Sequence, residues 1–391
     1  MVLFALIASL QLYAYPKLSE RSRVTLLTEC GGQEIYALWG HTALRVADDS
    51  LGVDDVFNYG IFDFTSSNFA WRFALGETDY ILGVSDMNHV YINSVARGLA
   101  LVEQTLDLNI NEKQRLWESL LENARKENRT YRYSFLYDNC VTRPIEMVEK
   151  SLDSQLIFRD TIPTGGTFRQ MIHATTTNYP WLKLGIDLVL GAPLDKSVTY
   201  REEFFLPVYL MKSLDSAYIS GENSRPIVSK RVQLVESEPD DMDDDLASKL
   251  PKPMVVISIF TIIWLFVTRI NYFEGKPMRA WQDALFFLPY GVAGVIIAFI
   301  SFVSTHPAAF PNWNILVFNP IQFIYSVLLF APFMASRRTL FHIVNLLLVV
   351  VFFVIYPFIG QTFPSETVLL AIISAIRSLV WIKKGRFSCL K

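Results

Sequence analysis

The pattern of hydrophobic residues divides the chain into two halves. From Met254 to Ile382 nearly every window is apolar, whereas the residues before about 250 carry mixed charges at the frequency of a globular protein. Five apolar segments in the second half each approach the ~20 residues that a membrane-spanning helix needs. They cover residues 254–270, 283–303, 315–334, 340–359 and 366–382. The pattern therefore predicts a bundle of five transmembrane helices.

The connections between these segments differ strongly in charge. One set contains Arg269, Lys276, Arg279, Arg337, Arg338, Lys383, Lys384 and Arg386. The alternate set, "STHPAAFPNWN" and "GQTFPSE", contains neither Lys nor Arg. The positive-inside rule assigns the first set and the C-terminus to the cytoplasm, so everything before residue 254 lies on the outer side. Arg377 lies near the inner end of the fifth segment, and we expect its side chain to snorkel to the headgroups.

The first half predicts a mixed α+β domain. Alternating β-branched and aromatic residues indicate strands in "RVTLLTE", "YALWGHTALRVAD" and "DDVFNYGIFDF". Residues 111–128 have the spacing of an amphipathic helix, with Asn111 as its cap. Residues 130–138 predict a further strand, which has its aromatic rings on the core face.

The composition suggests four regions. Residues 1–14 are apolar but too short to span a bilayer of about 30 Å, which predicts a signal peptide or a short anchor. Residues 15–225 form the outer domain, and residues 226–252 form an acidic linker bracketed by prolines. Residues 253–391 form the transmembrane domain with a basic cytoplasmic tail.

Cys140 lies where the expected strand 130–138 meets a helix. Asp138, Asn139 and Thr142 are residue types that cap helices, and Pro144 is tolerated only near the first turn. A thiol at a helix start has its pKa lowered from about 8.5 to between roughly 3.5 and 7.5, and nearby N–H groups stabilise an oxyanion. Cys140 is therefore either a nucleophile or a structural residue.

A nucleophilic thiol requires a base, and the outer domain has three histidines. His41 lies in a strand-like segment, and the following strand supplies Asn58 or Asp63 to orient its imidazole. We interpret His89 and His173 as surface or core histidines.

A disulfide is the main alternative role for the thiol. Cys30 and Cys140 are the two cysteines expected on the oxidising side, because Cys389 lies in the cytoplasmic tail. The chain has no Cys-x-x-Cys or other metal-binding spacing, so we expect no metal site. A net charge of −3 argues against a nucleic-acid partner.

Three strings in order, "TLLTECGGQEIYALWGHTALRV", "DDVFNYGIFDF" and "YSFLYDNCVTR", make the chain resemble the Lnb family of bacterial lipoprotein N-acyltransferases. The resemblance implies an α+β, circularly permuted papain-like domain followed by the five-helix transmembrane bundle. By position it implies Cys140 as nucleophile, His41 as base and Asn58, or else Asp63, as the third residue. The string "TECGG" departs from the family pattern and leaves the role of Cys30 open.

The resemblance also implies a reaction. Cys140 takes an acyl chain from a membrane phospholipid as a thioester and passes it to the α-amine of a diacylglyceryl-cysteine lipoprotein, without a cofactor. The protein is then expected in the bacterial inner membrane with its catalytic domain in the periplasm. Asn139 and His306 are supporting candidates, because Asn139 precedes the thiol and His306 lies in an outer loop near the lipid surface.

Two other functions stay open. The same dyad would serve a membrane-anchored cysteine peptidase or amidase acting on the cell envelope, although five spans exceed what an anchor requires. A non-enzymatic scaffold with a Cys30–Cys140 disulfide is the other.

Overall fold

The computed structural model describes residues 15–30, 32, 38–62, 68–77, 79–159, 162–163, 166–221, 224–237, 250–273, 279–334 and 336–388. The expected signal segment, Asp63, the acidic stretch 240–245 and Cys389 lie outside the described residues.

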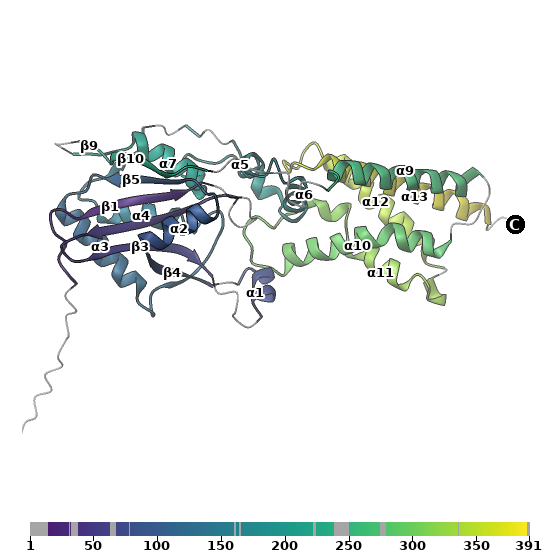
Figure 1. Cartoon of the computed structure of the whole chain (residues 1–391). Helices are drawn as coiled ribbons and strands as arrows, with labels where there is room; N and C mark the ends of the chain where they lie inside the picture. Colours follow the sequence, from purple (N-terminus) through teal and green to yellow (C-terminus); the bar gives the residue numbers. More distant parts are fainter. Residues whose placement is uncertain are drawn as a thin grey trace, which may run out of the picture.

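A seven-stranded antiparallel sheet forms the body of the outer domain (Figure 1). The strand order is β10-β5-β1-β2-β3-β4-β6, so the hairpins β1–β2 and β2–β3 lie at its centre. The strands are β1 Arg23–Glu29, β2 His41–Asp48, β3 Val53–Ile61, β4 Asp79–Asp86, β5 Leu101–Leu106, β6 Thr130–Arg132 and β10 Val228–Val235.

Helices cover both faces of this sheet. On one face α3 (Ile110–Ala124) and α4 (Thr142–Ser151) pack their apolar sides on Leu26, Leu44 and Phe57. On the other face α2 (Met87–Ala96) packs on Leu27 and Val56. The alternation of strand side chains between two buried faces explains why the strands contain so many β-branched residues.

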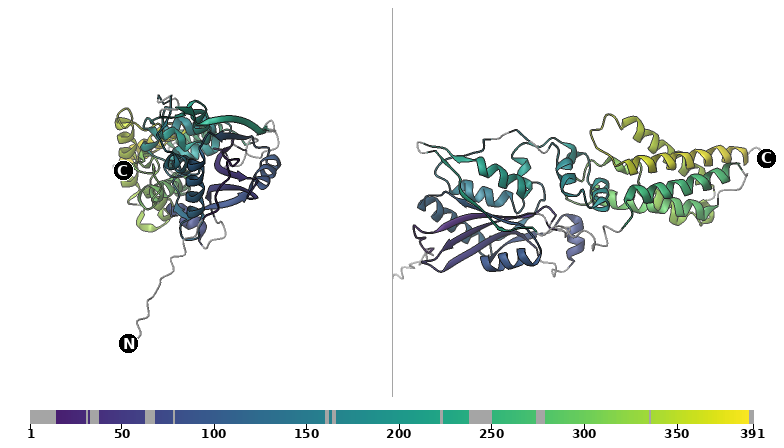
Figure 2. Two further views of the ribbon diagram at one scale, coloured as in Figure 1. Left: turned by 90° about the vertical axis from the view of Figure 1, so that its left-hand side faces the viewer. Right: turned by 45° about the horizontal axis from the view of Figure 1, so that its top comes forward.

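The chain between α4 and the membrane helices folds into several short helices and strands. They are β7 Leu156–Ile157, α5 Phe168–Thr175, α6 Pro180–Val189, η1 Ala192–Asp195, η2 Glu202–Phe205, α7 Pro207–Ser216, β8 Tyr218–Ile219 and β9 Arg225–Pro226, of which β7, β8 and β9 form a small sheet. Together with α1 (Phe69–Leu75), α5 and α6 lie between the sheet and the long helices in an elongated molecule (Figures 1 and 2).

The segment before Cys140 is a strand only at its beginning. β6 ends at Arg132, and a tight turn follows in which the amides of Tyr137 and Asp138 donate to the carbonyl of Ser134. The prediction of a strand over 130–138 with four rings on the core face is therefore wrong. Tyr137 is half exposed, because the turn carries it out of the sheet.

Two boundaries in the outer domain also differ from expectation. Helix α3 begins earlier than predicted, because Asn109 and Glu112 form a capping box that the expected cap Asn111 does not make. The strand β10 lies in the expected linker 226–252 and pairs with β5, so the outer domain extends at least to Val235. Its sequence "VSKRVQLV" fits an edge strand, in which exposed charges alternate with apolar residues.

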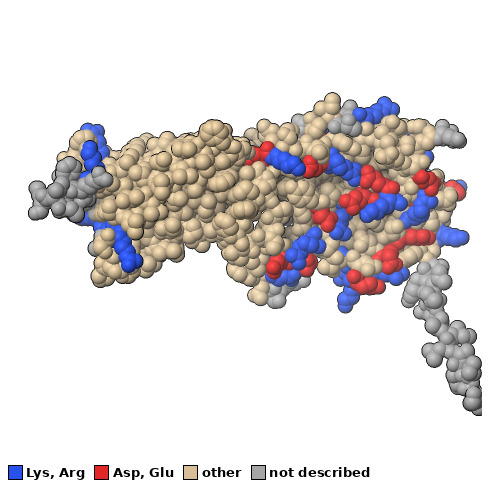
Figure 3. Space-filling view, turned by 180° about the vertical axis from the view of Figure 1, so that it is seen from behind, with Lys and Arg blue, Asp and Glu red and all other residues tan. Residues whose placement is uncertain are grey.

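Within the described residues, the second half contains four helices that are long and apolar enough to span a membrane. They are α9 Pro253–Phe273, α10 Ala280–Phe302, α12 Arg338–Ile355 and α13 Ser365–Ser388, the last with its apolar span at Ser365–Lys383. Figure 3 shows a broad surface of this half without charged residues, between the mixed charges of the outer domain and a tip that carries Lys and Arg.

The prediction of five spanning helices is wrong for the third segment. Residues 315–334 fold into the end of η3 (Trp313–Leu316), then α11 (Pro320–Leu328) and η4 (Pro332–Met334). The nine residues of α11 reach only about 14 Å at 1.5 Å per residue. The interruption has a local cause, since Asn319 caps α11 and Pro320 occupies its first turn.

The short helix α11 packs closely against α10. A Cβ on Gly291 would lie 2.1 Å from the backbone nitrogen of Phe323, and one on Gly294 would lie 2.4 Å from the carbonyl carbon of Asn319. Glycine at these two positions therefore lets the two backbones touch, as small residues do in membrane helix pairs.

Arg377 is fully buried, so the expectation that it snorkels is wrong. Its guanidinium donates to Asp283 Oδ1 at 2.6 and 2.9 Å and to Thr268 Oγ1 at 3.2 Å. His342 and Tyr325 contact the other oxygen of Asp283. This cluster joins α9, α10, α11, α12 and α13, because each helix contributes one of these residues.

Replacing one charge of this cluster is expected to destabilise the membrane half strongly. Arg377→Met leaves Asp283 buried without its guanidinium, which costs about 3–5 kcal/mol of unfolding free energy. Thermal unfolding of the full-length protein in detergent micelles measures the loss. The double variant Asp283→Leu with Arg377→Met should recover most of it, and the exposed Arg269→Met should cost almost nothing. Equal stability of the single and double variants would contradict the pairing.

Candidate active site

The strands β2 and β3 separate at one end of the sheet. Their ladder runs from Asp48↔Val53 to Leu44↔Phe57 and does not continue to His41, the first residue of β2. On its other side β3 has an irregularity in its pairing with β4 between Asn58 and Ile61. The separated strand ends leave room for a residue from another segment.

Cys140 occupies that room. Its sulfur accepts hydrogen bonds from the backbone amides of Thr42, in β2, and of Cys140 itself. The side chain is half-buried and lies two residues before α4, which begins at Thr142. The thiol is therefore held between a strand end and a helix start.

Asn139 fixes the turn that presents Cys140. Its Oδ1 accepts from the amides of Val141 and Thr142 at 2.8 and 3.1 Å. Its Nδ2 donates to the carbonyls of Phe135 and Phe205 at 2.7 and 2.9 Å. All of its hydrogen-bonding capacity is directed at the backbone, so Asn139 positions the thiol and does not face it.

His41 and Cys140 form a charged pair. Burial alone would lower the pKa of His41, but the negative charge of Cys140 and its hydrogen bond to the imidazole raise that pKa to about 9. Burial alone would raise the pKa of Cys140, but the positive charge of His41 and the same hydrogen bond lower it. The two pKa shifts have the same cause. The negative charge on Cys140 and the positive charge on His41 stabilise each other. Both shifts favour the thiolate–imidazolium form of the pair over the neutral form.

Asn58 lies on the other side of the imidazole. Its Nδ2 donates to the carbonyl of Val56 at 3.2 Å and to Ser85 Oγ at 3.0 Å. Those bonds fix the amide so that the remaining oxygen accepts from His41, which raises the pKa of the imidazole further. The structure thus brings together Cys140, His41 and Asn58, the three residues singled out from the sequence.

Two groups near the pair were missed by sequence reasoning. Glu29 lies opposite His41 in the β1–β2 ladder, and its charge also raises the pKa of His41. Tyr133 stacks on Tyr80 with ring centroids 4.2 Å apart, and its hydroxyl donates to the sulfur of Cys140. The alternation of "YRYSF" was interpreted as core packing, and nothing in that string distinguishes a ring that faces a thiol.

Glycine is required at two positions beside the pair. Gly60 has φ +90°, and a Cβ there would lie 3.3 Å from Cys140 Cβ. Gly40 has φ +81°, and a Cβ there would lie 2.5 Å from the carbonyl oxygen of Glu29. Both residues adopt a backbone conformation that favours glycine. A side chain at position 60 would press on Cys140, and one at position 40 would press on the backbone of Glu29 in β1.

The other described candidates belong to other segments of the structure. His306 donates from Nε2 to the carbonyl of Phe73 at 2.7 Å, so it ties the outer loop to α1. His89 lies in the first turn of α2. Asp63 lies outside the described residues.

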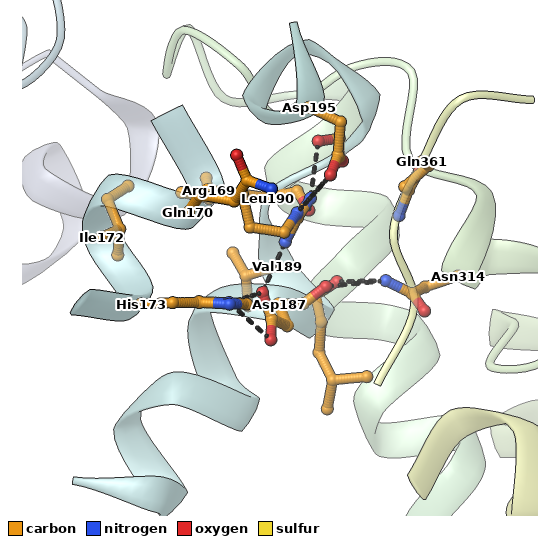
Figure 4. Close-up of polar contacts among 12 residues, drawn as sticks. Arg169, Gln170, Ile172, His173, Asp187, Val189, Leu190, Asp195, Asn314 and Gln361 are labelled. Atoms are coloured by element: carbon orange, nitrogen blue, oxygen red, sulfur yellow. Dashed lines mark hydrogen bonds and ion pairs between the residues drawn. The ribbon is translucent and has the colours of Figure 1, made fainter. Parts of the chain in front are cut away.

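His173 belongs to a polar cluster at the junction of the two halves (Figure 4). Its Nε2 contacts both oxygens of Asp187 at 2.8 and 3.0 Å, and the buried Arg169 donates to Asp187 at 2.6 Å and to Asp195 at 3.0 Å. The backbone carbonyl of Asp187 accepts from Asn314 Nδ2 at 2.9 Å. These polar groups satisfy one another and link α5, α6 and η1 to the membrane half.

Thr305 also connects the outer loop, residues 304–314, to α1. The amide and hydroxyl of Thr305 both donate to the carbonyl of Leu75, at 2.8 and 3.0 Å, and Trp71 packs on Phe299 of α10. Helix α1 lies in the connection from β3 to β4, and the ends of β1 and β3 point toward the membrane helices (Figure 1). The thiol pair therefore lies at the end of the sheet that faces the membrane half.

The alternative of a disulfide is wrong. Cys30 and Cys140 are both free, and Cys30 has Arg231 and Lys212 as its charged neighbours. Burial raises the pKa of the Cys30 thiol, in contrast to that of Cys140. The two thiols therefore lie in different environments.

Comparisons with known families match both halves of the chain. The family description "Lnb N-terminal periplasmic domain" matches residues 15–174, and "Lnb transmembrane domain" matches residues 245–385. Searches of curated proteins and of solved structures found no match. The expected papain-like permutation therefore stays a prediction.

The fold and these matches define a multi-pass membrane protein with a periplasmic N-terminal domain. The chain belongs to the Lnb family.

The charged pair predicts how Cys140 reacts with iodoacetamide as the pH changes. Because the pKa of Cys140 is lowered and that of His41 is raised to about 9, the fall of the rate in acid should begin at a lower pH than for an ordinary thiol. His41→Ala removes the cation and leaves the burial, so the thiol pKa should return to about 8.5 or above and the rate at neutral pH should fall at least about tenfold.

The measurement is made in a Cys30→Ser background, so that Cys140 is followed alone. His89→Ala is the matched control, because His89 lies in α2, and it should leave the profile unchanged. An unchanged profile in His41→Ala would show that the imidazole does not stabilise the thiolate.

Proposed function

We propose that this protein is a lipoprotein N-acyltransferase. It moves an acyl chain from a membrane phospholipid to the α-amine of a diacylglyceryl-cysteine lipoprotein, through a thioester on Cys140. The observation that carries the proposal is the thiolate–imidazolium pair of Cys140 and His41 at the membrane-side end of the sheet.

In the first step the Cys140 thiolate attacks the carbonyl carbon of a phospholipid ester. The acyl C–O bond breaks, the departing lysophospholipid oxygen takes the proton of His41, and the acyl chain stays on sulfur as a thioester. Proton donation by a positioned imidazole typically contributes about 10²–10⁴ in rate. Asn58 holds the imidazole in orientation for this transfer.

In the second step the α-amine of the lipoprotein attacks the thioester carbonyl. His41, now neutral, accepts the proton that the amine loses, an amide forms, and the thiolate leaves. The charged pair is then restored. An α-amine has a pKa near about 7.7–8.0, so a substantial fraction is neutral and nucleophilic at neutral pH.

The membrane half contributes proximity. Both substrates carry their reactive groups near the surface of the outer leaflet, and the junction clusters of Asp187 and Thr305 hold the thiol at a fixed place over the membrane helices. Fixing a reactant in this way replaces a bimolecular encounter by an intramolecular one. The half-buried site also limits the water that competes with the amine. On this orientation the interrupted segment 313–334 also carries the chain through the bilayer, from the contact of Asn314 with α6 to the cluster at Tyr325, and the C-terminus is cytoplasmic.

A transfer assay tests the proposal. Full-length protein in phospholipid vesicles is incubated with a diacylated lipopeptide, and mass spectrometry detects the triacylated product. Cys140→Ala should lower the rate by at least about 10³, because it removes the nucleophile. Cys30→Ser is the matched control and should keep the activity, since the charged groups that act on that thiol are Arg231 and Lys212 and not His41.

Activity retained in Cys140→Ala would refute the proposal. Cleavage of a peptide bond in the lipopeptide, with no acyl gain, would favour the cysteine peptidase or amidase instead.

A further inference from the structure

The hydroxyl of Tyr131 is buried and has no hydrogen-bond partner among the described residues. The residue is 8% exposed and lies in β6. Its ring is fixed by the guanidinium of Arg143, 3.6 Å from the ring centroid, and by the ring of Tyr59 at 6.1 Å. A buried hydroxyl without a partner costs about 1–3 kcal/mol, and buried polar groups in native proteins are nearly always paired. An unpaired hydroxyl held this firmly therefore requires an explanation.

The hydroxyl lies next to the candidate nucleophile. A Cβ built on Gly60 would lie 3.9 Å from Tyr131 Oη and 3.3 Å from Cys140 Cβ. The phenol and the thiol therefore border the same small space beside Gly60, and a side chain is absent from that space because the residue is glycine. An acyl group bonded to the sulfur has its carbonyl oxygen within a few ångströms of the sulfur.

The neighbouring tyrosines already use their hydroxyls. Tyr59 donates to Asn123 Oδ1 at 2.6 Å, and Tyr133 donates to the sulfur of Cys140. Tyr131 thus differs from both neighbours in having its donor free. Burial raises the pKa of Tyr131, so the phenol keeps its proton and remains a donor at neutral pH.

We propose that Tyr131 Oη donates a hydrogen bond to the carbonyl oxygen of the acyl group while Cys140 attacks it, so that Tyr131 is a catalytic residue of the reaction. This inference rests on the proposed function. When the sulfur–carbon bond forms, the electron pair of the C=O double bond moves to oxygen, and the Tyr131 hydroxyl stabilises that oxyanion without giving up its proton. The backbone N–H of Cys140 is the second donor nearby, as at other helix-start nucleophiles.

The test is Tyr131→Phe in the full-length protein in phospholipid vesicles. Single-turnover mass spectrometry follows the acyl thioester on Cys140. Loss of one oxyanion donor should slow acylation about 10²–10³-fold. The loss should fall on the maximal rate constant (kcat), and the phospholipid concentration that gives half the maximal rate (KM) should be nearly unchanged. Alkylation of Cys140 by iodoacetamide should keep its rate, because displacement at an alkyl carbon builds no oxyanion. Thermal stability should be equal to or higher than that of the wild type, because Phe removes an unpaired hydroxyl.

Tyr59→Phe is the matched control and should give the opposite result. It breaks the bond to Asn123, so it should lower the melting temperature and leave the acylation rate within a few-fold. Site-specific replacement Tyr131→3-fluorotyrosine keeps the ring and strengthens the donor, so it should keep or raise the rate even where Tyr131→Phe folds poorly.

The outcomes separate the two claims. Acylation in Tyr131→Phe at the wild-type rate, or a parallel loss of alkylation and acylation, would overturn the role of Tyr131 alone. Absence of any Cys140 thioester in the wild type with phospholipid would overturn the proposed function and this inference together.

Discussion

The thiolate–imidazolium pair of Cys140 and His41 is the interaction on which the rest of the site depends. Each charge is partly removed from water, and each is stable there because the other compensates it. The separation of β2 from β3 beyond Leu44, and the glycine at position 60, leave the room in which the pair fits. The backbone amide of Thr42 then donates to the sulfur, so the sheet contributes its own dipole to the negative charge. The separation of β2 from β3 and the glycine at position 60 weaken the sheet at this end, and both also make room for the site.

The membrane half holds that pair at a defined distance from lipid. Asn314 and Thr305 bind the backbones of α6 and α1, so the two ties flank the sheet end and restrict rotation of the outer domain. Inside the bundle Asp283 and Arg377 form a buried charged pair that each long helix helps to enclose. Breaking such a pair is costly in hydrocarbon, so it fixes the arrangement of the helices on which the outer domain rests. A rigid platform suits the proposed reaction, whose two substrates diffuse in the plane of the membrane.

The sequence was sufficient for the features that depend on local pattern. Cys140 was singled out because cap-type residues precede a helix, and His41 because alternation assigns it and an orienting Asn58 or Asp63 to adjacent strands. The choice of Asn58 over Asp63 came from the family resemblance. The sequence was insufficient where the position of a side chain depends on a contact between segments that are distant in the chain. Tyr131 was interpreted as core, and only its proximity to Gly60 shows that its hydroxyl borders the same small space as Cys140. Arg377 was expected to snorkel, because its partner lies 94 positions earlier in the chain. Hydropathy alone also missed the break in the third apolar segment, since capping chemistry ends a helix inside an apolar run.

The most direct test of this account is the intact mass of the full-length protein after incubation in phospholipid vesicles without an acceptor. The account predicts a mass gain of one acyl chain on Cys140, removed by hydroxylamine and transferred to the amine when a diacylated lipopeptide is added. A protein that stays unmodified while lipopeptide is nevertheless acylated would contradict it, because the acyl chain would then not pass through the thiol that His41 holds ionised.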